Sequence, residues 1–187
     1  MASPTSTAAL PRLEALPRWL RNEMRSNHAG ETGAVMIYRG ILAVSKNEEV
    51  RGFAVEHLQR EEEHLAFFDA WMPDATQSIL LPLWRLAGWM LGALASFGGA
   101  PAVYLTIDAV ENFVVEHYDS QISRLRQERL YPDIARLLQT FRDDEQHHRE
   151  DACDRYLPAL YESFAGRAWY AVVDTGSRLA VAAARLC

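Results

Sequence analysis

Cysteine is scarce in this sequence, and its scarcity limits the compartments and metal sites to consider. The chain has 187 residues and two cysteines, Cys153 and Cys187. Two distant cysteines are neither the disulfide framework of a small secreted domain nor the cluster that holds zinc or a single iron through thiolates. The sequence therefore favours a reducing compartment and argues against a cysteine-based metal site.

Positive charge is also in short supply. Lys and Arg total 19 against 25 Asp and Glu, so the formal net charge is −6. Nucleic-acid affinity comes mainly from clustered Lys and Arg, and this balance excludes a general nucleic-acid binder. Neither a G-x-G-x-x-G segment nor a P-loop occurs in the sequence, so a nucleotide-binding domain is not expected.

The first residues lack the long apolar run of a secretory signal. Residues 1–17, MASPTSTAALPRLEALP, are rich in small residues and proline, and one Arg beside one Glu is a poor transit peptide. We expect a flexible N-terminal tail over residues 1–17. Residues 18–187 are long enough to bury a sizeable core and are predicted to form a single domain.

Extended alternation of apolar and polar residues is nearly absent, and the apolar spacing is helical. Four long helices are predicted. The first begins at Pro17, the second begins at a Ser45 capping box and ends near Met72, the third follows Gly98 to Pro101, and the fourth runs from Pro132 to near Pro158. Such long amphipathic helices in one chain are typical of a four-helix bundle, which makes the predicted fold all-α.

Polar residues interrupt the apolar stripe of each helix. The interruptions are Glu31, then Glu61 and His64, then Glu111, and finally Glu145 and His148. An unpaired buried carboxylate costs several kcal/mol or takes up a proton, and four converging carboxylates also repel one another. No arginine lies on these inner faces beside the glutamates, so we expect metal cations to compensate the charge.

The spacing of these residues repeats in the two halves of the chain. A lone glutamate, Glu31 or Glu111, precedes a Glu-x-x-His pair, and residues i and i+3 share one face of a helix. Chance would give roughly half of one Glu-x-x-His in a chain of this composition, so a single copy would mean little. Two lone glutamates with two such pairs form the ligand set of ferritin-like di-iron and di-manganese bundles. The alternative interpretation is that the acids face solvent and that the histidines are satisfied in the core.

Oxygen-rich ligands with one nitrogen per metal suit iron or manganese better than structural zinc. Four carboxylates and two imidazoles leave open positions on both metals, so O2 activation is plausible.

The segment Ile79–Ala100, ILLPLWRLAGWMLGALASFGGA, forms the most apolar stretch. Its uninterrupted part after Arg85 is too short to cross a bilayer comfortably. We favour a helix that lies in the membrane surface, with a spanning helix and a buried connector as alternatives. Three arginines, Arg18, Arg21 and Arg25, share one face beside Trp19, and an amphipathic helix is expected over about Glu162 to Leu186. Both features suit anionic lipid headgroups, although a solvated cationic face and a helix packed on the bundle would leave the same pattern.

The sequence resembles the demethoxyubiquinone hydroxylases of ubiquinone biosynthesis from about Asn22 to the C-terminus. The resemblance is densest in NHAGETGAVMIYRG, EEEHL, PLWRLAGWMLGA, AVENFVVEHYDSQI and FRDDEQHH. It implies the same six metal ligands and a role for His117 and Tyr118 near the substrate or in electron delivery, with packing as the alternative role for Tyr118. The sequence departs from the family pattern at Asn27, where Asp is usual, at Gly40-Ile41, and at the additional His57.

The resemblance implies a di-iron monooxygenase that hydroxylates the ring of a polyprenylated methoxy-benzoquinol with O2. The expected cofactors are two Fe ions, with NADH or another reductant as electron source. The expected partners are the quinol and a membrane lipid surface, and other ubiquinone-biosynthesis proteins and further copies of the chain are additional candidates. We expect a peripheral protein on the cytoplasmic face of the bacterial inner membrane or the matrix face of the mitochondrial inner membrane. A di-iron quinol oxidase, a ferritin-like iron-storage protein and a non-enzymatic membrane scaffold are the alternatives.

Overall fold

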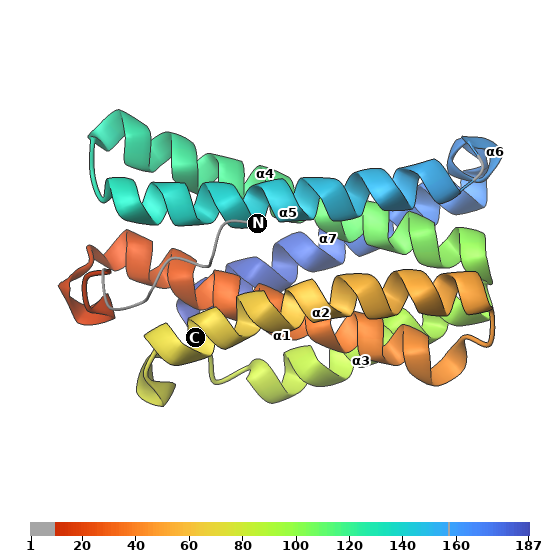
Figure 1. Cartoon of the computed structure of the whole chain (residues 1–187), viewed down its shortest axis with the longest axis horizontal. Coiled ribbons are helices and arrows are strands. Elements are labelled where there is room, and N and C mark those ends of the chain that lie inside the picture. Colours follow the sequence, from red (N-terminus) through yellow and green to blue (C-terminus); the bar gives the residue numbers. More distant parts are fainter. Residues whose placement is uncertain (1–9, 157) are drawn as a thin grey trace.

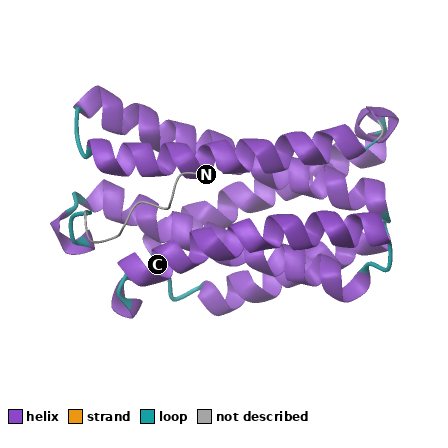
Figure 2. Cartoon of the chain, viewed as in Figure 1, coloured by secondary structure: helices purple, strands orange, loops and turns teal. Residues whose placement is uncertain are grey.

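The computed structural model describes residues 10–156 and 158–187, and this part of the chain is helical and contains no strand (Figure 2). The helices are α1 (Arg18–Val44), α2 (Glu48–Trp71), α3 (Leu81–Phe97), α4 (Ala100–Glu128), α5 (Pro132–Arg155), α6 (Pro158–Glu162) and α7 (Phe164–Leu186). Two 3-10 turns, Leu13–Ala15 and Asp74–Thr76, precede α1 and α3.

The four long helices form two neighbouring pairs. Figure 1 shows α4 and α5 side by side along the upper edge, with α1 and α2 below them. The apolar helix α3 packs along α1, and α7 runs behind the bundle in contact with α1 and α4. The predicted all-α bundle is confirmed, with its additional apolar helix between the second and third long helices and its amphipathic helix at the C-terminus.

The start of the second long helix differs from the prediction. Asn47, not Ser45, is the N-cap of α2, and its side chain accepts a hydrogen bond from the Val50 N–H at 3.1 Å. Ser45 instead closes α1, where its backbone N–H donates to the Ile41 carbonyl at 2.8 Å. Asn is as good an N-cap as Ser, and Ser45 is still engaged by the preceding helix.

Residues 10–17 of the segment that the sequence suggests as a tail contact the bundle. Leu13 and Leu16 are each 2% exposed and belong to the core, and the Trp71 indole N–H donates to the Pro11 carbonyl at 3.1 Å. Burial of two leucines stabilises this segment against the bundle, so residues 10–17 pack with the domain. Residues 1–9 lie outside the described residues.

Two apolar clusters form the core, one toward each end of the bundle. One cluster contains Leu20, Met24, Phe68, Ile122 and Leu138, and the other contains Tyr38, Phe53, Tyr104, Ile107 and Ala152. In each of α1, α2, α4 and α5 the buried glutamates and histidines fall between the residues of one cluster and those of the other. The polar residues therefore meet in the middle of the bundle, with one apolar cluster on either side of them.

Candidate metal centre

Four buried glutamates and two buried histidines converge at mid-bundle. Their exposed fractions are at most 4% for the acids and 3% for the histidines. They form two overlapping groups, one of Glu31, Glu61, His64 and Glu145, and the other of Glu61, Glu111, Glu145 and His148. In each group one ligand atom per residue lies within 4.8 Å of the others. The structure thus brings together all six residues that the sequence singled out, and Glu61 and Glu145 belong to both groups.

Both histidines direct the same ring nitrogen inward. His64 Nδ1 lies 2.9 Å from Glu145 and 3.5 Å from Glu31, and His148 Nδ1 lies 2.9 Å from Glu61 and 3.0 Å from Glu145. The outer nitrogen of His64, Nε2, lies 3.1 Å from the Asp144 carboxylate. A carboxylate on the second nitrogen fixes the orientation of a metal-ligating histidine, and Asp144 is in place to do this for His64.

The donor set fits a cation because several of its buried atoms have no hydrogen-bond partner among the described residues. Both oxygens of Glu61, one oxygen of Glu145 and His64 Nδ1 are buried without a hydrogen bond in the described structure, although histidine nitrogens lie close by. No lysine or arginine of the described residues forms an ion pair with any of the four acids. Carboxylate oxygens with one imidazole per group are ligands that iron and manganese accept, so the residues present fit a dinuclear metal site.

The pKa values of the acids are shifted in different directions. Burial, and then the neighbouring Glu145 carboxylate, raises the pKa of Glu61 to about 8. The same two causes hold the pKa of Glu111 well above its usual range. Burial also opposes ionisation of Glu145, but the adjacent His148 and His64 lower its pKa below the usual value. Crowded carboxylates take up protons when no cation is present, and a divalent cation favours their ionised forms.

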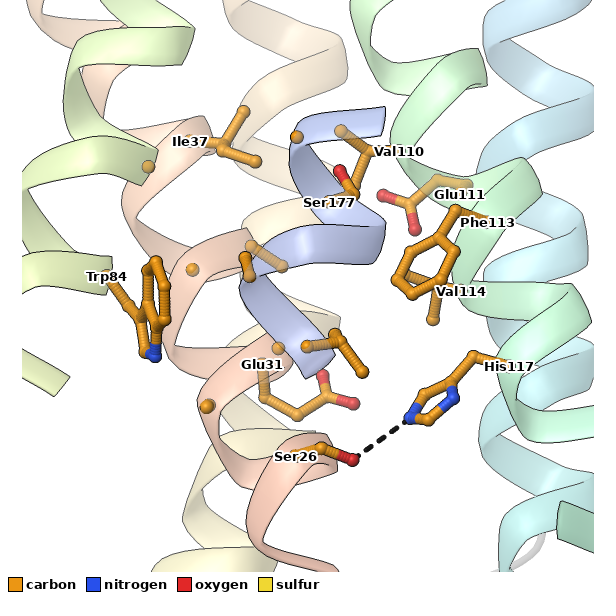
Figure 3. Close-up of a pocket in the computed structure, with 18 of the residues that line it drawn as sticks. Ser26, Glu31, Ile37, Trp84, Val110, Glu111, Phe113, Val114, His117 and Ser177 are labelled. Atoms are coloured by element: carbon orange, nitrogen blue, oxygen red, sulfur yellow. Dashed lines mark hydrogen bonds between the residues drawn. The ribbon is translucent and has the colours of Figure 1, made fainter. Parts of the chain in front are cut away.

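Tyr118 and His117, on successive positions of α4, face the site differently. The Tyr118 hydroxyl is buried and donates a hydrogen bond to Glu31, which links it directly to the acid cluster. His117 lies further out, with Nε2 3.1 Å from the Ser26 hydroxyl (Figure 3). Its Nδ1 lies 3.1 Å from the Arg185 guanidinium. Burial, and then the charge of Arg185, lowers the pKa of His117 to about 3, so the ring is neutral near pH 7.

An apolar cavity of about 290 Å³ adjoins the acid cluster. It lies between α1, α3, α4 and α7 and is lined largely by apolar side chains such as Trp84, Leu91, Val114, Val173 and Val181. All four clustered glutamates also line this cavity, together with His117 and Tyr118. Figure 3 shows Glu31 and Glu111 directed toward the same space as Phe113 and His117. A ligand in the cavity would therefore contact the acid cluster on one side and apolar side chains on the others.

The helical positions of His28 and His147 predict poorer ligands than the six residues above, and the sequence leaves the role of His57 and several polar partners open. His28 is buried and bonds the Asp69 carboxylate at 2.8 Å, whereas His147 is exposed. His57 is buried beside His148 and bonds Asp151 at 2.9 Å. Helical periodicity placed His57 on the inner face, but no local signal identified Asp151, which lies on another helix.

Asn27, at a position where the sequence departs from the family pattern, bonds Gln121 reciprocally. Each amide nitrogen lies 2.9 Å from the other residue's oxygen. Two amides satisfy each other in this way, so a neutral Asn is stable at this buried position.

The fold and the site together define a ferritin-like helical bundle with a buried glutamate and histidine cluster that can hold a metal. A model of the family described as "Ubiquinone biosynthesis protein COQ7" matches residues 18–184. The chain belongs to this family, as the resemblance implied.

Individual relatives support the same assignment. The chain is 38% identical over 130 residues to the 3-demethoxyubiquinol 3-hydroxylase of Rhodospirillum rubrum, a match that covers 68% of this chain and 60% of the relative. It is 33% identical over 135 residues to the human mitochondrial NADPH-dependent 3-demethoxyubiquinone 3-hydroxylase, covering 70% of this chain and 62% of the relative. The corresponding protein of Dictyostelium discoideum is 31% identical over 163 residues, covering 84% of this chain and 73% of the relative. The chain thus spans less than two thirds of the length of two of these relatives.

Proposed function

We propose that this protein is a di-iron monooxygenase that hydroxylates the ring of a polyprenylated demethoxyubiquinol with O2. The observation that carries the proposal is the apolar cavity whose wall includes all four clustered glutamates. A hydrophobic ring that enters this cavity lies against the residues that can hold a metal. Relatives that are hydroxylases of demethoxyubiquinol or demethoxyubiquinone supply the substrate class.

The residues that would hold the two iron ions are Glu31, Glu61, His64, Glu111, Glu145 and His148, and Glu61 and Glu145 belong to both groups. Two bound irons would supply the O2 activation that hydroxylation of an aromatic ring requires. Apolar clusters at both ends of the centre restrict the entry of water, which protects the reaction from side reactions.

The quinol head is proposed to bind between α4 and α7, beside His117 and Ser26. The Ser26–His117 hydrogen bond presents polar groups at the edge of an otherwise apolar cavity. A few polar groups in an apolar pocket orient a ligand, and a quinol oxygen is the part of the substrate that suits them. Tyr118 is proposed to hold the orientation of Glu31 through its hydroxyl.

The protein is proposed to attach to the surface of a membrane, through which its polyprenyl substrate would arrive. Leu83, Leu86, Met90, Leu94 and Phe97 on α3 are each at least 47% exposed and recur at three- or four-residue spacing along one helical face. No helix in the described part of the chain is long and apolar enough to cross a bilayer. An exposed apolar face on a short helix suits insertion into the headgroup region.

The reductant is proposed to be a nicotinamide nucleotide, because several relatives are named as NADPH-dependent. Partner proteins of ubiquinone biosynthesis and self-association also remain proposals. The mitochondrial relatives and the bacterial relative are consistent with either predicted location, the matrix face or the cytoplasmic face of an inner membrane.

An isotope experiment tests the proposal. Protein loaded anaerobically with Fe(II) is mixed with demethoxyubiquinol and a reductant and then exposed to 18O2. The expected product is a ring-hydroxylated quinol that carries one 18O atom by mass spectrometry. Glu111→Ala should abolish the labelled product, whereas Glu56→Ala, an exposed glutamate on α2, should not. Oxidation of the quinol without 18O incorporation would indicate a quinol oxidase, and iron accumulation without quinol turnover would indicate an iron-storage protein.

A further inference from the structure

A second cavity, of about 240 Å³, lies where α1 begins and α7 ends. It is lined by Arg18, Arg21, Asn22, Arg25, Arg185 and Leu186, so four of its six lining residues are arginines. Three of them recur along one face of α1, and the fourth comes from the far end of the chain. This concentration of positive charge contrasts with the net charge of −6 of the whole protein.

Neutral carbonyl groups hold two of these arginines in place. Arg21 donates to the backbone carbonyls of Glu14 and Leu16 at 3.2 and 3.0 Å, and Arg25 donates to that of Thr76 at 3.0 Å. Within the described residues Arg18, Arg21 and Arg25 form no ion pair with a carboxylate, and only Arg185 does, with Glu23 at 2.9 Å. Carbonyl oxygens orient a guanidinium without neutralising it, so the charge of Arg21 and Arg25 stays available to an anion.

The surroundings of the cavity indicate which anion it accepts. Leu186, at its rim, is 82% exposed, and Ile79, at the start of the apolar segment, is 80% exposed. The Ile79 N–H donates to the Cys187 carbonyl at 3.0 Å, which ties the end of α7 to the segment before α3. The arginine cavity therefore adjoins exposed apolar side chains, and its ligand combines an anionic head with hydrocarbon.

We propose that this arginine cavity binds the phosphate group of an anionic phospholipid. Arginine binds phosphate oxygens through paired N–H donors, and basic residues beside an apolar helix face add affinity for anionic lipid surfaces. The proposal rests on the proposed membrane attachment and deepens it, because it adds a headgroup site to the proposed apolar contacts.

The phosphate site also connects to the substrate cavity. Arg185 lines the arginine cavity, and its guanidinium contacts His117 Nδ1 at 3.1 Å. His117 lines the apolar cavity beside the acid cluster. The Arg185 guanidinium would thus contact both a bound phosphate and His117, which borders the proposed quinol site. Lipid binding and quinol binding would then involve one connected set of contacts.

Vesicle binding by the full chain tests this proposal. Sedimentation with phosphatidylcholine vesicles, with and without a minor fraction of phosphatidylglycerol, measures the preference for anionic lipid. Arg18→Gln/Arg21→Gln should reduce that preference roughly tenfold or more and leave binding to neutral vesicles unchanged. Arg18→Gln alone, at an exposed side chain, should lose part of the preference without risk to the fold. The control Arg51→Gln/Arg136→Gln removes the same charge at exposed positions of α2 and α5 and should keep the preference.

Three outcomes would overturn the proposal. Equal binding of the wild type to both vesicles would do so while leaving apolar membrane attachment and hydroxylation intact. An equal loss in the control pair would show general charge attraction instead of a site. Calorimetric binding of inorganic phosphate that disappears in Arg18→Gln/Arg21→Gln, with the vesicle preference retained, would assign the cavity to a soluble phosphate.

Discussion

At the scale of single residues, the acids of the cluster differ in the number and closeness of their polar partners. Glu145 has a histidine nitrogen within 3.0 Å of each of its two oxygens. Glu111 has a single, long hydrogen bond, from the Tyr38 hydroxyl at 3.5 Å. Removal of Glu145 leaves two histidines with fewer partners, whereas removal of Glu111 leaves almost nothing unpaired. Glu111 therefore best separates a role in metal binding from a role in stability.

We predict that Glu111→Leu leaves the metal-free protein at least as stable as the wild type. Replacing a poorly satisfied buried polar group by a hydrophobe is often neutral or stabilises by about 1 kcal/mol or more. With Fe(II) the order should reverse, because bound metal stabilises only the form that holds it. Anaerobic thermal melts and iron analysis measure both effects, with iron falling from two to about one per chain. A metal-free variant that melts well below the wild type would assign Glu111 a structural role, and Glu56→Leu is the control.

His117 should remain neutral throughout the physiological pH range. Its pKa is lowered from 6.5 to about 3 by burial and then by Arg185, so between these values the unfolded chain binds a proton that the folded chain does not. Stability contributed by this group is thus present above pH 6.5 and is lost as the pH falls toward 3. Nitrogen NMR of the metal-free protein should show a neutral His117 ring at pH 5.5. In Arg185→Gln the pKa should rise, and protonation of wild-type His117 near pH 6 would contradict the prediction.

At the scale of the helices, glycines determine how α3 lies against α1. A Cβ atom on Gly92 would approach the Ile37 carbonyl oxygen to 2.0 Å, and one on Gly40 would approach the Trp89 carbonyl oxygen to 2.1 Å. The two helix backbones are therefore in direct contact on both sides of the seam. Because α3 forms a wall of the apolar cavity, this seam also sets the width of the proposed quinol site.

Gly92→Ala should separate α3 from α1 and destabilise the protein by about 1–3 kcal/mol, the usual cost of overpacking. Gly52→Ala is the matched control, because nothing lies within 4 Å of the added Cβ on α2. The control should stabilise by roughly 0.5–1 kcal/mol, since alanine is the better helix former. Urea denaturation of both variants measures the difference in the free energy of unfolding. Equal stability of Gly92→Ala and the wild type would show that α3 can shift at little cost.

At the scale of the whole molecule, the exposed apolar side chains are unevenly distributed. α3 carries a continuous exposed row, and α7 adds Val172, Leu179 and Leu186 at seven-residue spacing. On α2, by comparison, Val55 stands among exposed polar and charged neighbours. Contiguous exposed apolar surface marks a binding face, whereas a single exposed residue has no such meaning.

Leu86→Glu should weaken binding to lipid vesicles by about tenfold or more, because it removes an apolar side chain worth about 1.5–3 kcal/mol on burial and adds a charge. Val55→Glu is the control, since both side chains are 57% exposed. In the wild type, vesicles should also protect Trp84 and Trp89 from an aqueous fluorescence quencher. If vesicles do not protect the tryptophans from the quencher, and if Leu86→Glu and Val55→Glu bind vesicles equally well, then α3 has no role in membrane binding.

Much of the fold was predictable because the decisive patterns are local. Periodic apolar residues predicted the four long helices, and proline and glycine indicated most of their ends. The candidate ligands were predictable for the same reason: a Glu-x-x-His pair presents both side chains on one helical face wherever that helix lies. The predicted N-cap of α2, Ser45, was wrong. Ser45 and Asn47 are both suitable N-caps, but Ser45 closes α1 and Asn47 therefore caps α2.

The sequence by itself determined the helical class, the six candidate ligands and the amphipathic segments, since each depends on the spacing of neighbouring residues. Only the tertiary structure decided what lies beside those ligands. The apolar cavity is lined by residues of six helices, and the Arg185–His117 contact joins residues from α7 and α4. The burial of Leu13 and Leu16 likewise depends on a surface that other helices supply. Such features follow from the packing of distant segments, whose geometry no local periodicity specifies.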